Sequence, residues 1–249
     1  MKLILAQNEA DLGKKAAAIF LDTIQKKSHA TLGLATGSSP ISTYAALINA
    51  YQKGLVSFSR VHTLNLDEYV GLAPENDQSY HYFMKQNLFD SIDIDPANTH
   101  LPTADAADLD AACKEYNDLI DRFPIDLQLL GIGGNGHLGF NEPGTPFDIR
   151  THLVDLTEKT RKDNSRLFPS LNCVPKQAIT MGIGDILKAK AILLIAFGEN
   201  KASAIENMLK GPISPACPAS VLRTHPNVTL VADAAALKNL DKKDLEILS

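Results

Sequence analysis

The chain has 249 residues, of which 45% are hydrophobic and 21% are charged, and its formal net charge at pH 7 is −5. This balance is typical of a globular protein with a sizeable core. Because the net charge is acidic and the basic residues are scattered, the composition excludes an electrostatic nucleic-acid surface, and we expect no nucleic-acid partner.

The apolar segments alternate with amphipathic ones along the whole chain. The apolar runs predict strands at residues 2–5, 31–35, 61–66, 126–132, 152–156, 178–181, 191–196 and 228–232, and the amphipathic stretches predict helices at 10–26, 41–51, 80–89, 107–123 and 201–209. Continuous apolar strands between helices are typical of a parallel sheet buried on both faces. We therefore predict a single α/β domain over residues 1–249, a doubly wound, mostly parallel sheet with helices on both faces.

The cysteines and the N-terminal segment indicate the cellular compartment of the protein. Cys113, Cys173 and Cys217 are odd in number, far apart and without a CxxC pair, so we expect neither a disulfide framework nor a metal site. The apolar run at residues 3–6 is too short for a signal peptide, and no apolar stretch reaches membrane-spanning length. We expect a cytoplasmic protein without a membrane partner.

The first candidate site follows the second predicted strand. In doubly wound sheets, ligands bind beyond the carboxyl ends of the strands. In LGLATGSSP the strand leads through Thr36, Gly37, Ser38 and Ser39 to Pro40, which suits a first helical turn. Free backbone N–H groups and hydroxyls at such a helix start can bind a phosphate, whereas the alternative is a serine that caps the helix without a ligand. The stretch lacks the lysine of a nucleotide P-loop.

Charged residues lie near other predicted strand ends. Arg166 stands near the start of a helix, and Lys201 follows the next-to-last strand; each completes a phosphate site or is a solvated surface charge. Asp67 and Glu68 follow the third strand, and neighbouring residues on an extended chain point to opposite sides, so at most one of them faces a given pocket. A carboxylate at this place can serve as a general base or cap a turn.

Residues 131–144, GIGGNGHLGFNEPG, contain the G-x-G-x-x-G spacing of a dinucleotide-binding loop. Pro143 and Pro146 prevent the regular helix that should follow such a loop, which argues against a dinucleotide. We interpret the segment as a catalytic loop whose glycines let the backbone approach a small ligand. His137 could transfer protons near neutral pH with Glu142 orienting its imidazole; the alternative is a loop histidine beside a surface glutamate.

Five stretches, LGLATGSSP, NLDEYVGL, GIGGNGHLGFNEPG, TRKDNSRLF and GENKASAI, occur in this order over nearly the whole chain and closely resemble the motifs of glucosamine-6-phosphate deaminases. The resemblance implies one modified Rossmann-like domain that needs no cofactor, neither a nucleotide nor a metal. It also implies the substrate and the reaction, in which glucosamine 6-phosphate and water give fructose 6-phosphate and ammonia in amino-sugar catabolism.

The resemblance implies a role for each residue of the catalytic set. Asp67 would move a proton between C2 and C1 of the sugar. His137 would open the pyranose ring, and Glu142 would orient and polarise the imidazole through a hydrogen bond. Asn135 belongs to the same loop, at a position where many members of the family have aspartate.

The resemblance also implies how the substrate is anchored. Its phosphate would be held by the turn at residues 36–39, by Arg166 and by Lys201. Binding energy at this remote group can position C1 and C2 over the base.

The sequence departs from allosteric members of the family between the NEPG and NSR motifs. His152 and Val154 stand where those members carry basic residues, and the chain ends at Ser249 without their longer tail. We therefore predict a non-allosteric enzyme that is a monomer or a low-order homo-oligomer.

Two other functions are compatible with parts of the pattern. A 6-phosphogluconolactonase shares the fold and the phosphate site, but the NLDEY and NEPG motifs argue against it. A sugar-phosphate sensor usually carries a helix-turn-helix domain and can lose catalytic acids, whereas this chain shows no such domain and keeps Asp67, His137 and Glu142.

Overall fold

The computed structural model describes residues 1–165 and 168–246. Its strands are β1 (Lys2–Ala6), β2 (Thr31–Leu34), β3 (His62–Asn65), β4 (Asp67–Tyr69), β5 (Thr99–His100), β6 (Leu127–Leu130), β7 (His152–Asp155), β8 (Gln177–Thr180), β9 (Ile192–Ala196) and β10 (Val228–Asp233). Its α-helices are α1 (Glu9–Lys26), α2 (Ile41–Gln52), α3 (Tyr80–Asn87), α4 (Leu109–Arg122), α5 (Glu158–Asn164), α6 (Ile183–Ile186), α7 (Ala202–Lys210) and α8 (Lys242–Glu246). Short 3₁₀ helices lie at Phe89–Ser91, Pro96–Asn98, Leu171–Cys173, Glu199–Lys201 and Pro218–Thr224.

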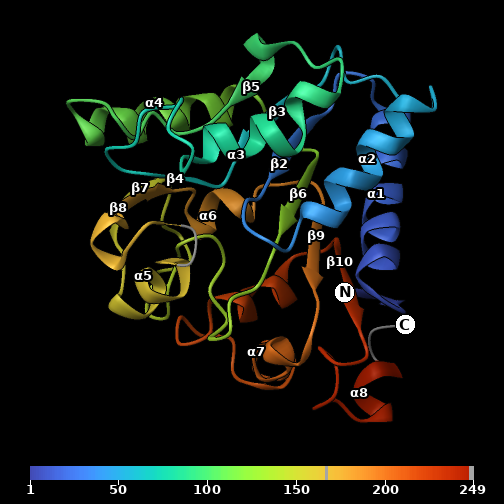
Figure 1. The fold of residues 1–249 in the computed structure, drawn as a ribbon. Coiled ribbons are helices and arrows are strands. Elements are labelled where there is room, and N and C mark those ends of the chain that lie inside the picture. The colour runs from blue at the N-terminus through green and yellow to red at the C-terminus, as the bar shows by residue number, and fades with distance from the viewer. Residues whose placement is uncertain (166–167, 247–249) are drawn as a thin grey trace.

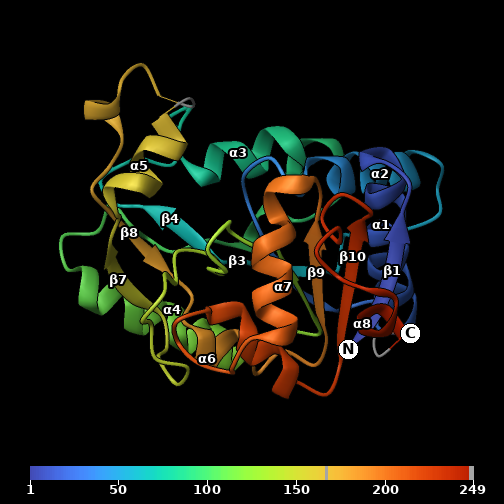
Figure 2. The same ribbon diagram turned by 90° about the horizontal axis from the view of Figure 1, so that it is seen from below.

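The main sheet has seven strands in the order β1-β10-β9-β6-β2-β3-β5, and its strand pairs are all parallel. Strands β2, β6 and β9 are buried along their whole length, which explains their continuous apolar sequences. Figure 2 shows α2 and α3 on one side of the strands and α4 and α6 on the other. The predicted α/β class with a mostly parallel sheet is confirmed.

A second, three-stranded sheet, β4-β8-β7, is antiparallel. The strands predicted at residues 152–156 and 178–181 exist as β7 and β8, but their assignment to the parallel sheet was wrong. An apolar run indicates burial and does not reveal the direction of the neighbouring strand. Strands β4 and β5 were not predicted, because they have only three and two residues.

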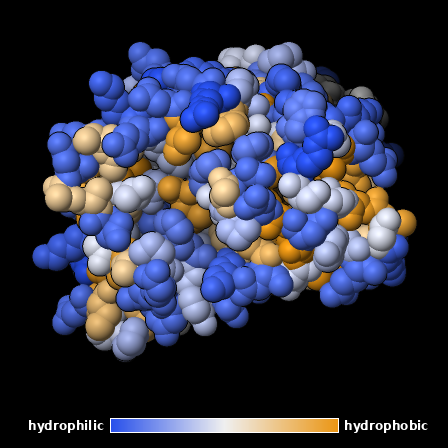
Figure 3. All heavy atoms as spheres, turned by 90° about the horizontal axis from the view of Figure 1, so that it is seen from above, coloured by the Kyte–Doolittle hydropathy of each residue, from blue (hydrophilic) through white to orange (hydrophobic). Residues whose placement is uncertain are grey.

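The helices α1 and α2 pack side by side against the main sheet (Figure 1). A Cβ atom on Gly13 of α1 would lie 2.3 Å from the carbonyl oxygen of Ser42 in α2, so only glycine permits this close approach. The face seen in Figure 3 is mostly hydrophilic, with hydrophobic residues in small groups between polar ones. No helix within residues 1–165 and 168–246 is both long and apolar enough to cross a bilayer.

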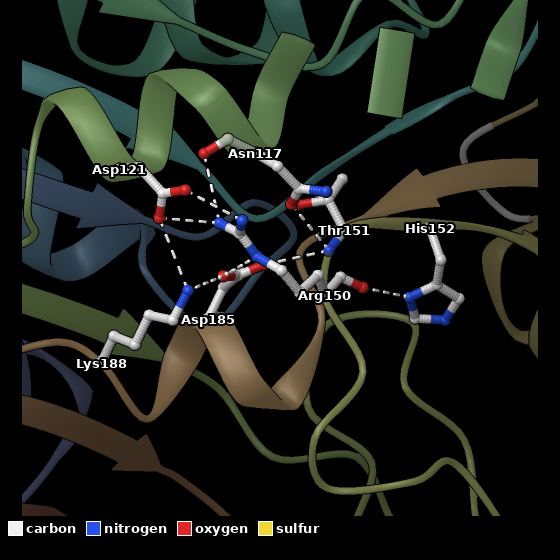
Figure 4. Close-up of polar contacts among 7 residues, drawn as sticks. All are labelled: Asn117, Asp121, Arg150, Thr151, His152, Asp185 and Lys188. Atoms are coloured by element: carbon white, nitrogen blue, oxygen red, sulfur yellow. Dashed lines mark hydrogen bonds and ion pairs between the residues drawn. The ribbon is translucent and has the colours of Figure 1, made fainter. Parts of the chain in front are cut away.

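The long loop between β6 and β7 is anchored at its far end by a cluster of ion pairs (Figure 4). Arg150 donates from Nε to Asp185 at 2.8 Å and from its two terminal nitrogens to Asp121 at 2.9 Å. The buried Asp185 also accepts the backbone N–H of Thr151 and the ammonium of Lys188, each at 3.0 Å. Because these acids belong to α4 and α6, the cluster ties the start of β7 to both helices.

Candidate active site

A cavity of about 610 Å³ opens at the carboxyl ends of β2, β6 and β9. The chain leaves β2 toward β3 and returns on its other side as β6, so the cavity lies at a topological switch point, the usual ligand site of doubly wound sheets. The predicted site residues that line it are Thr36, Gly37, Ser38, Ser39, Asp67, Asn135, His137, Glu142 and Lys201. The remaining one, Arg166, lies outside the described residues.

The turn after β2 leads directly into α2. Gly37 has a φ of +86°, a left-handed conformation that favours glycine, and it lets the turn reverse toward the cavity. Pro40 stands at the N-cap of α2, and its side chain makes no capping hydrogen bond. The alternative of a serine capping the helix is therefore not what the structure shows, and the helix start faces the cavity with the hydroxyls of Ser38 and Ser39 beside it.

Lys201 reaches the same cavity from the turn after β9. Its ammonium donates at 2.8 Å to the carbonyl oxygen of Ile132, in the loop just after β6. The turn is fixed at its start because Gly198, with a φ of +89°, donates its N–H to Asp233 at 2.9 Å. A cation is thereby placed on the cavity wall that also carries the turn after β2.

Asp67 and Glu68 diverge as the alternation of an extended chain predicts. Asp67 lines the cavity. Glu68 turns away and accepts the N–H groups of Tyr80 and His81, each at 2.9 Å, at the start of α3. One acid of the pair therefore serves the cavity and the other caps a helix.

The environment of Asp67 favours its neutral form. Burial and then the charge of Glu68 raise the pKa of Asp67 to about 8, although a hydrogen bond with the hydroxyl of Thr36 acts in the opposite direction. Gly139 borders this carboxyl with a φ of +58°, and a Cβ atom there would lie 3.2 Å from Asp67 Oδ2 and 3.0 Å from Thr180 Oγ1. A carboxyl with a pKa near neutrality is suited to take up and return a proton.

A chain of hydrogen bonds joins the imidazole to the glutamate of the catalytic loop. His137 Nδ1 lies 2.7 Å from Asn135 Oδ1, and Asn135 Nδ2 donates to Glu142 Oε2 at 2.7 Å. The carboxylate itself is 3.7 Å from His137 Nδ1, beyond hydrogen-bonding distance. The contact predicted between Glu142 and the imidazole is thus made through the amide of Asn135.

The glycines of the loop bring the backbone against the imidazole. A Cβ atom on Gly133 would lie 2.1 Å from His137 Cε1, so a larger residue would displace the ring. The turn is closed by hydrogen bonds from Gly133 N to His137 O at 3.0 Å and from Gly136 N to Gly133 O at 2.9 Å. The spacing that resembles a dinucleotide fingerprint serves here to pack a histidine.

The cavity also contains residues that the sequence analysis did not single out: Tyr80, Phe140, Thr160, Phe197 and Asn200. Tyr80 is the first residue of α3, and burial above all raises its pKa well above its ordinary value, with Tyr69 and Asp67 adding to the effect. Tyr80 and Thr160 come from α3 and α5, which a search of strand ends alone does not reach. The described residues contain no group of three or more His, Cys, Asp or Glu side chains that could hold a metal ion.

The model of one family, described as glucosamine-6-phosphate isomerases/6-phosphogluconolactonase, matches residues 6–231. The chain is 48% identical over 252 residues to a glucosamine-6-phosphate deaminase of Thermoanaerobacter pseudethanolicus, with 100% of both chains covered. It is 52% identical over 237 residues to one of Shouchella clausii, covering 95% of this chain and 96% of the relative.

Two solved structures show how far the fold extends. A monomeric glucosamine-6-phosphate deaminase superposes with a TM-score of 0.94 at 47% identity, covering 96% of this chain and 99% of that one. A 6-phosphogluconolactonase from Leishmania guyanensis superposes with a TM-score of 0.77 at 20% identity, covering 96% and 98%, which shows a shared fold alone. The chain therefore belongs to the family of glucosamine-6-phosphate isomerases and 6-phosphogluconolactonases.

Proposed function

We propose that this enzyme is a glucosamine-6-phosphate deaminase, which isomerises and deaminates D-glucosamine 6-phosphate with water to D-fructose 6-phosphate and ammonia. The observation that carries the proposal is that a buried carboxyl, an oriented imidazole and a helix start suited to phosphate line one cavity. Identities of 48% and 52% to deaminases, over nearly the whole of each chain, favour this activity over the lactonase alternative.

The substrate phosphate binds at the turn after β2. The backbone N–H groups and hydroxyls of residues 36–39 surround it, and the ammonium of Lys201 supplies a positive charge. Arg166, predicted to grip the same group, follows α5 in the sequence. A phosphate held here is remote from the reacting carbons, so its binding energy positions C1 and C2 without taking part in the chemistry.

His137 opens the sugar ring. Its Nδ1 donates to Asn135 Oδ1, so Nε2 is the nitrogen that can accept and return a proton. Nε2 takes the proton of the anomeric hydroxyl and delivers it to the ring oxygen, which leaves C1 as an aldehyde. Glu142 supports the charged imidazole electrostatically from 3.7 Å.

Asp67 then carries out the isomerisation. The ammonium group of the substrate favours the ionised carboxylate by charge attraction. The carboxylate removes the proton from C2 while the ammonium group gives one proton to O1, which yields an enolamine with a hydroxyl on C1. The carboxyl then returns its proton to C1, which leaves an iminium group at C2. Water adds to the iminium group and ammonia leaves, which yields the ketose.

The test measures ammonia and fructose 6-phosphate together during incubation with glucosamine 6-phosphate. Equal amounts of both are expected, and Asp67→Asn abolishes both while inorganic phosphate still binds. A parallel incubation with 6-phosphogluconolactone tests the lactonase alternative. Hydrolysis of the lactone, with no ammonia released from glucosamine 6-phosphate, would reject the deaminase. Near-normal turnover by Asp67→Asn would place the base elsewhere.

We further infer a non-allosteric enzyme that is a monomer or a low-order homo-oligomer. His152, at a position where allosteric members carry a basic residue, turns its ring nitrogen to the carbonyl oxygen of Arg150 at 2.9 Å (Figure 4). Burial lowers the pKa of His152, although this hydrogen bond acts in the opposite direction, so the ring is neutral near pH 7. A neutral ring bound to backbone offers little to a second sugar phosphate.

A further inference from the structure

We propose that Thr160 is a positioning residue for the reaction, holding Glu142 so that Asn135 fixes the tautomer of His137. The inference rests on the proposed function for its kinetic consequences only. Thr160 lies in α5, outside the catalytic loop, so the catalytic set is complete only when this helix is seated on the loop. Thr160 begins the stretch TRKDNSRLF, but neither the loop motif nor the strand-end pattern includes it, and the resemblance implies no role for it.

The contact between Thr160 and Glu142 is short and partly buried in the wall of the cavity. Thr160 Oγ1 donates to Glu142 Oε1 at 2.5 Å, and Thr160 is 9% exposed. Thr157, the N-cap of α5, donates its hydroxyl to Thr160 Oγ1 at 2.9 Å and accepts the N–H of Thr160 at 3.1 Å. Because Thr160 Oγ1 already accepts from Thr157, its own hydrogen is directed to the carboxylate.

The two oxygens of Glu142 are held from different elements. Oε1 accepts from Thr160 in α5, and Oε2 accepts from the amide nitrogen of Asn135 in the loop. With both oxygens occupied, the carboxylate cannot rotate, and the amide of Asn135 has a fixed acceptor. The amide oxygen is thereby turned toward His137 Nδ1, which must carry the proton.

Loss of the threonine hydroxyl has a defined consequence for the imidazole. A carboxylate held at one oxygen can rotate away from Asn135, and the amide is then oriented only by its oxygen, which accepts the backbone N–H of His137 over a long 3.3 Å beside the contact to Nδ1. An inverted amide would point its NH₂ group at His137 Nδ1, which is compatible only with a proton on Nε2. Thr160 therefore acts on the tautomer of a residue that it does not touch.

The kinetic test compares Thr160→Val, which is isosteric and lacks the hydroxyl, with Thr160→Ser, which keeps it. We expect the valine variant to lose about tenfold to a hundredfold in kcat, as for a hydrogen bond to a charged group, with KM changed by less than about twofold. The serine variant should recover kcat to within about threefold of the wild type. The matched control is Thr23→Val, because Thr23 Oγ1 donates at 2.8 Å to Ile19 O within α1, away from the cavity. It should leave both constants unchanged.

A spectroscopic readout tests the same inference without turnover. The ¹⁵N resonances of the His137 imidazole, assigned with His137→Gln, should show a proton on Nδ1 in the wild type and in Thr160→Ser. In Thr160→Val they should shift toward the form protonated on Nε2, at an unchanged melting temperature.

The outcomes separate the two proposals. A valine variant with wild-type kcat and an unchanged imidazole spectrum overturns the role of Thr160. A raised KM with unchanged kcat and spectrum does so too, because it would reduce Thr160 to a structural contact of α5. If the wild type does not deaminate glucosamine 6-phosphate, the proposed function fails, while the His137 spectrum still decides the inference.

Discussion

The substitution Asp67→Asn should stabilise the protein while it abolishes activity. Burial, and then the charge of Glu68, raise the pKa of Asp67 to about 8 against the hydrogen bond from Thr36. In the unfolded chain the same carboxyl titrates near 3.9. An acid with a raised pKa binds its proton more tightly in the folded state, so stability is lost as the pH rises from about 4, and the loss is complete above about pH 8. Asparagine cannot ionise and avoids that loss.

The magnitude follows from the two proton affinities. Each pKa unit between the folded and unfolded states corresponds to about 1.36 kcal/mol of folding free energy. The stability that Asp67→Asn gains therefore has an upper limit of about 6 kcal/mol above pH 8 and about 4 kcal/mol at pH 7. The realised gain is smaller because Asp67 borders an open cavity, and we expect about 1–3 kcal/mol at pH 8. Urea unfolding of the wild type and Asp67→Asn between pH 5 and pH 8.5 measures the gain, which must grow with pH.

Asp126→Asn is the control of opposite sign. Burial acts to raise the pKa of Asp126, but hydrogen bonds from Lys190, Lys27 and the N–H of Thr31 outweigh it, and the pKa is lowered. This carboxylate therefore stabilises the fold above its unfolded pKa, and that contribution disappears as the pH falls. Asp126→Asn should lose stability at neutral pH and approach the wild type in acid. The assigned environment of Asp67 is refuted if the stability change of Asp67→Asn does not depend on pH, or if it has the same sign as that of Asp126→Asn. Either result would mean that the folded structure does not raise the pKa of Asp67.

Three further outcomes are expected. In Gly139→Ala, the new Cβ atom is strained at a φ of +58° and crowded against Asp67 and Thr180. The variant should therefore lose at least about tenfold in kcat and about 1–2 kcal/mol of stability. Wild-type activity would show that the loop backbone moves to accommodate the methyl group. Arg150→Gln should leave the buried Asp185 without its guanidinium partner. The free energy of unfolding should fall by about 2–4 kcal/mol in denaturant titrations, while the folded protein keeps its turnover. An unchanged denaturation midpoint would mean that the ion-pair cluster does not stabilise the fold. The rate should depend hyperbolically on glucosamine 6-phosphate, with or without N-acetylglucosamine 6-phosphate, and a sigmoidal curve abolished by that compound would contradict a non-allosteric enzyme.

The fold could be predicted from the sequence wherever burial alone determines the pattern. The apolar runs that became β2, β6 and β9 are buried on both faces, so their strands and the polar residues just beyond them were visible without coordinates. The same reasoning located the turn at residues 36–39, Asp67 and Lys201 on one cavity. Hydrophobicity could not show that β7 and β8 pair antiparallel, because it does not encode strand direction.

The rest of the candidate site depends on contacts between distant segments. Glu68 caps α3 through Tyr80, twelve residues away, and nothing in NLDEY distinguishes that capping acid from the acid that faces the cavity. Thr160 has the appearance of an ordinary threonine in the first turn of a helix. Its partner, Glu142, is eighteen residues away, so only the packing of α5 on the loop reveals the pair.

The geometry around Asn135 limits where protons can travel. An amide accepts through oxygen and donates through nitrogen, and it does not relay a proton at neutral pH. The hydrogen bonds from His137 to Asn135 and from Asn135 to Glu142 therefore transmit orientation, while the charge of Glu142 acts on the imidazole through space from 3.7 Å. In the proposed mechanism, His137 therefore exchanges protons with the substrate through Nε2 alone. Because the side chain of Asn135 is uncharged, the proposed mechanism leaves the support of the imidazolium to Glu142, and the hydrogen bonds that hold this carboxylate matter correspondingly more.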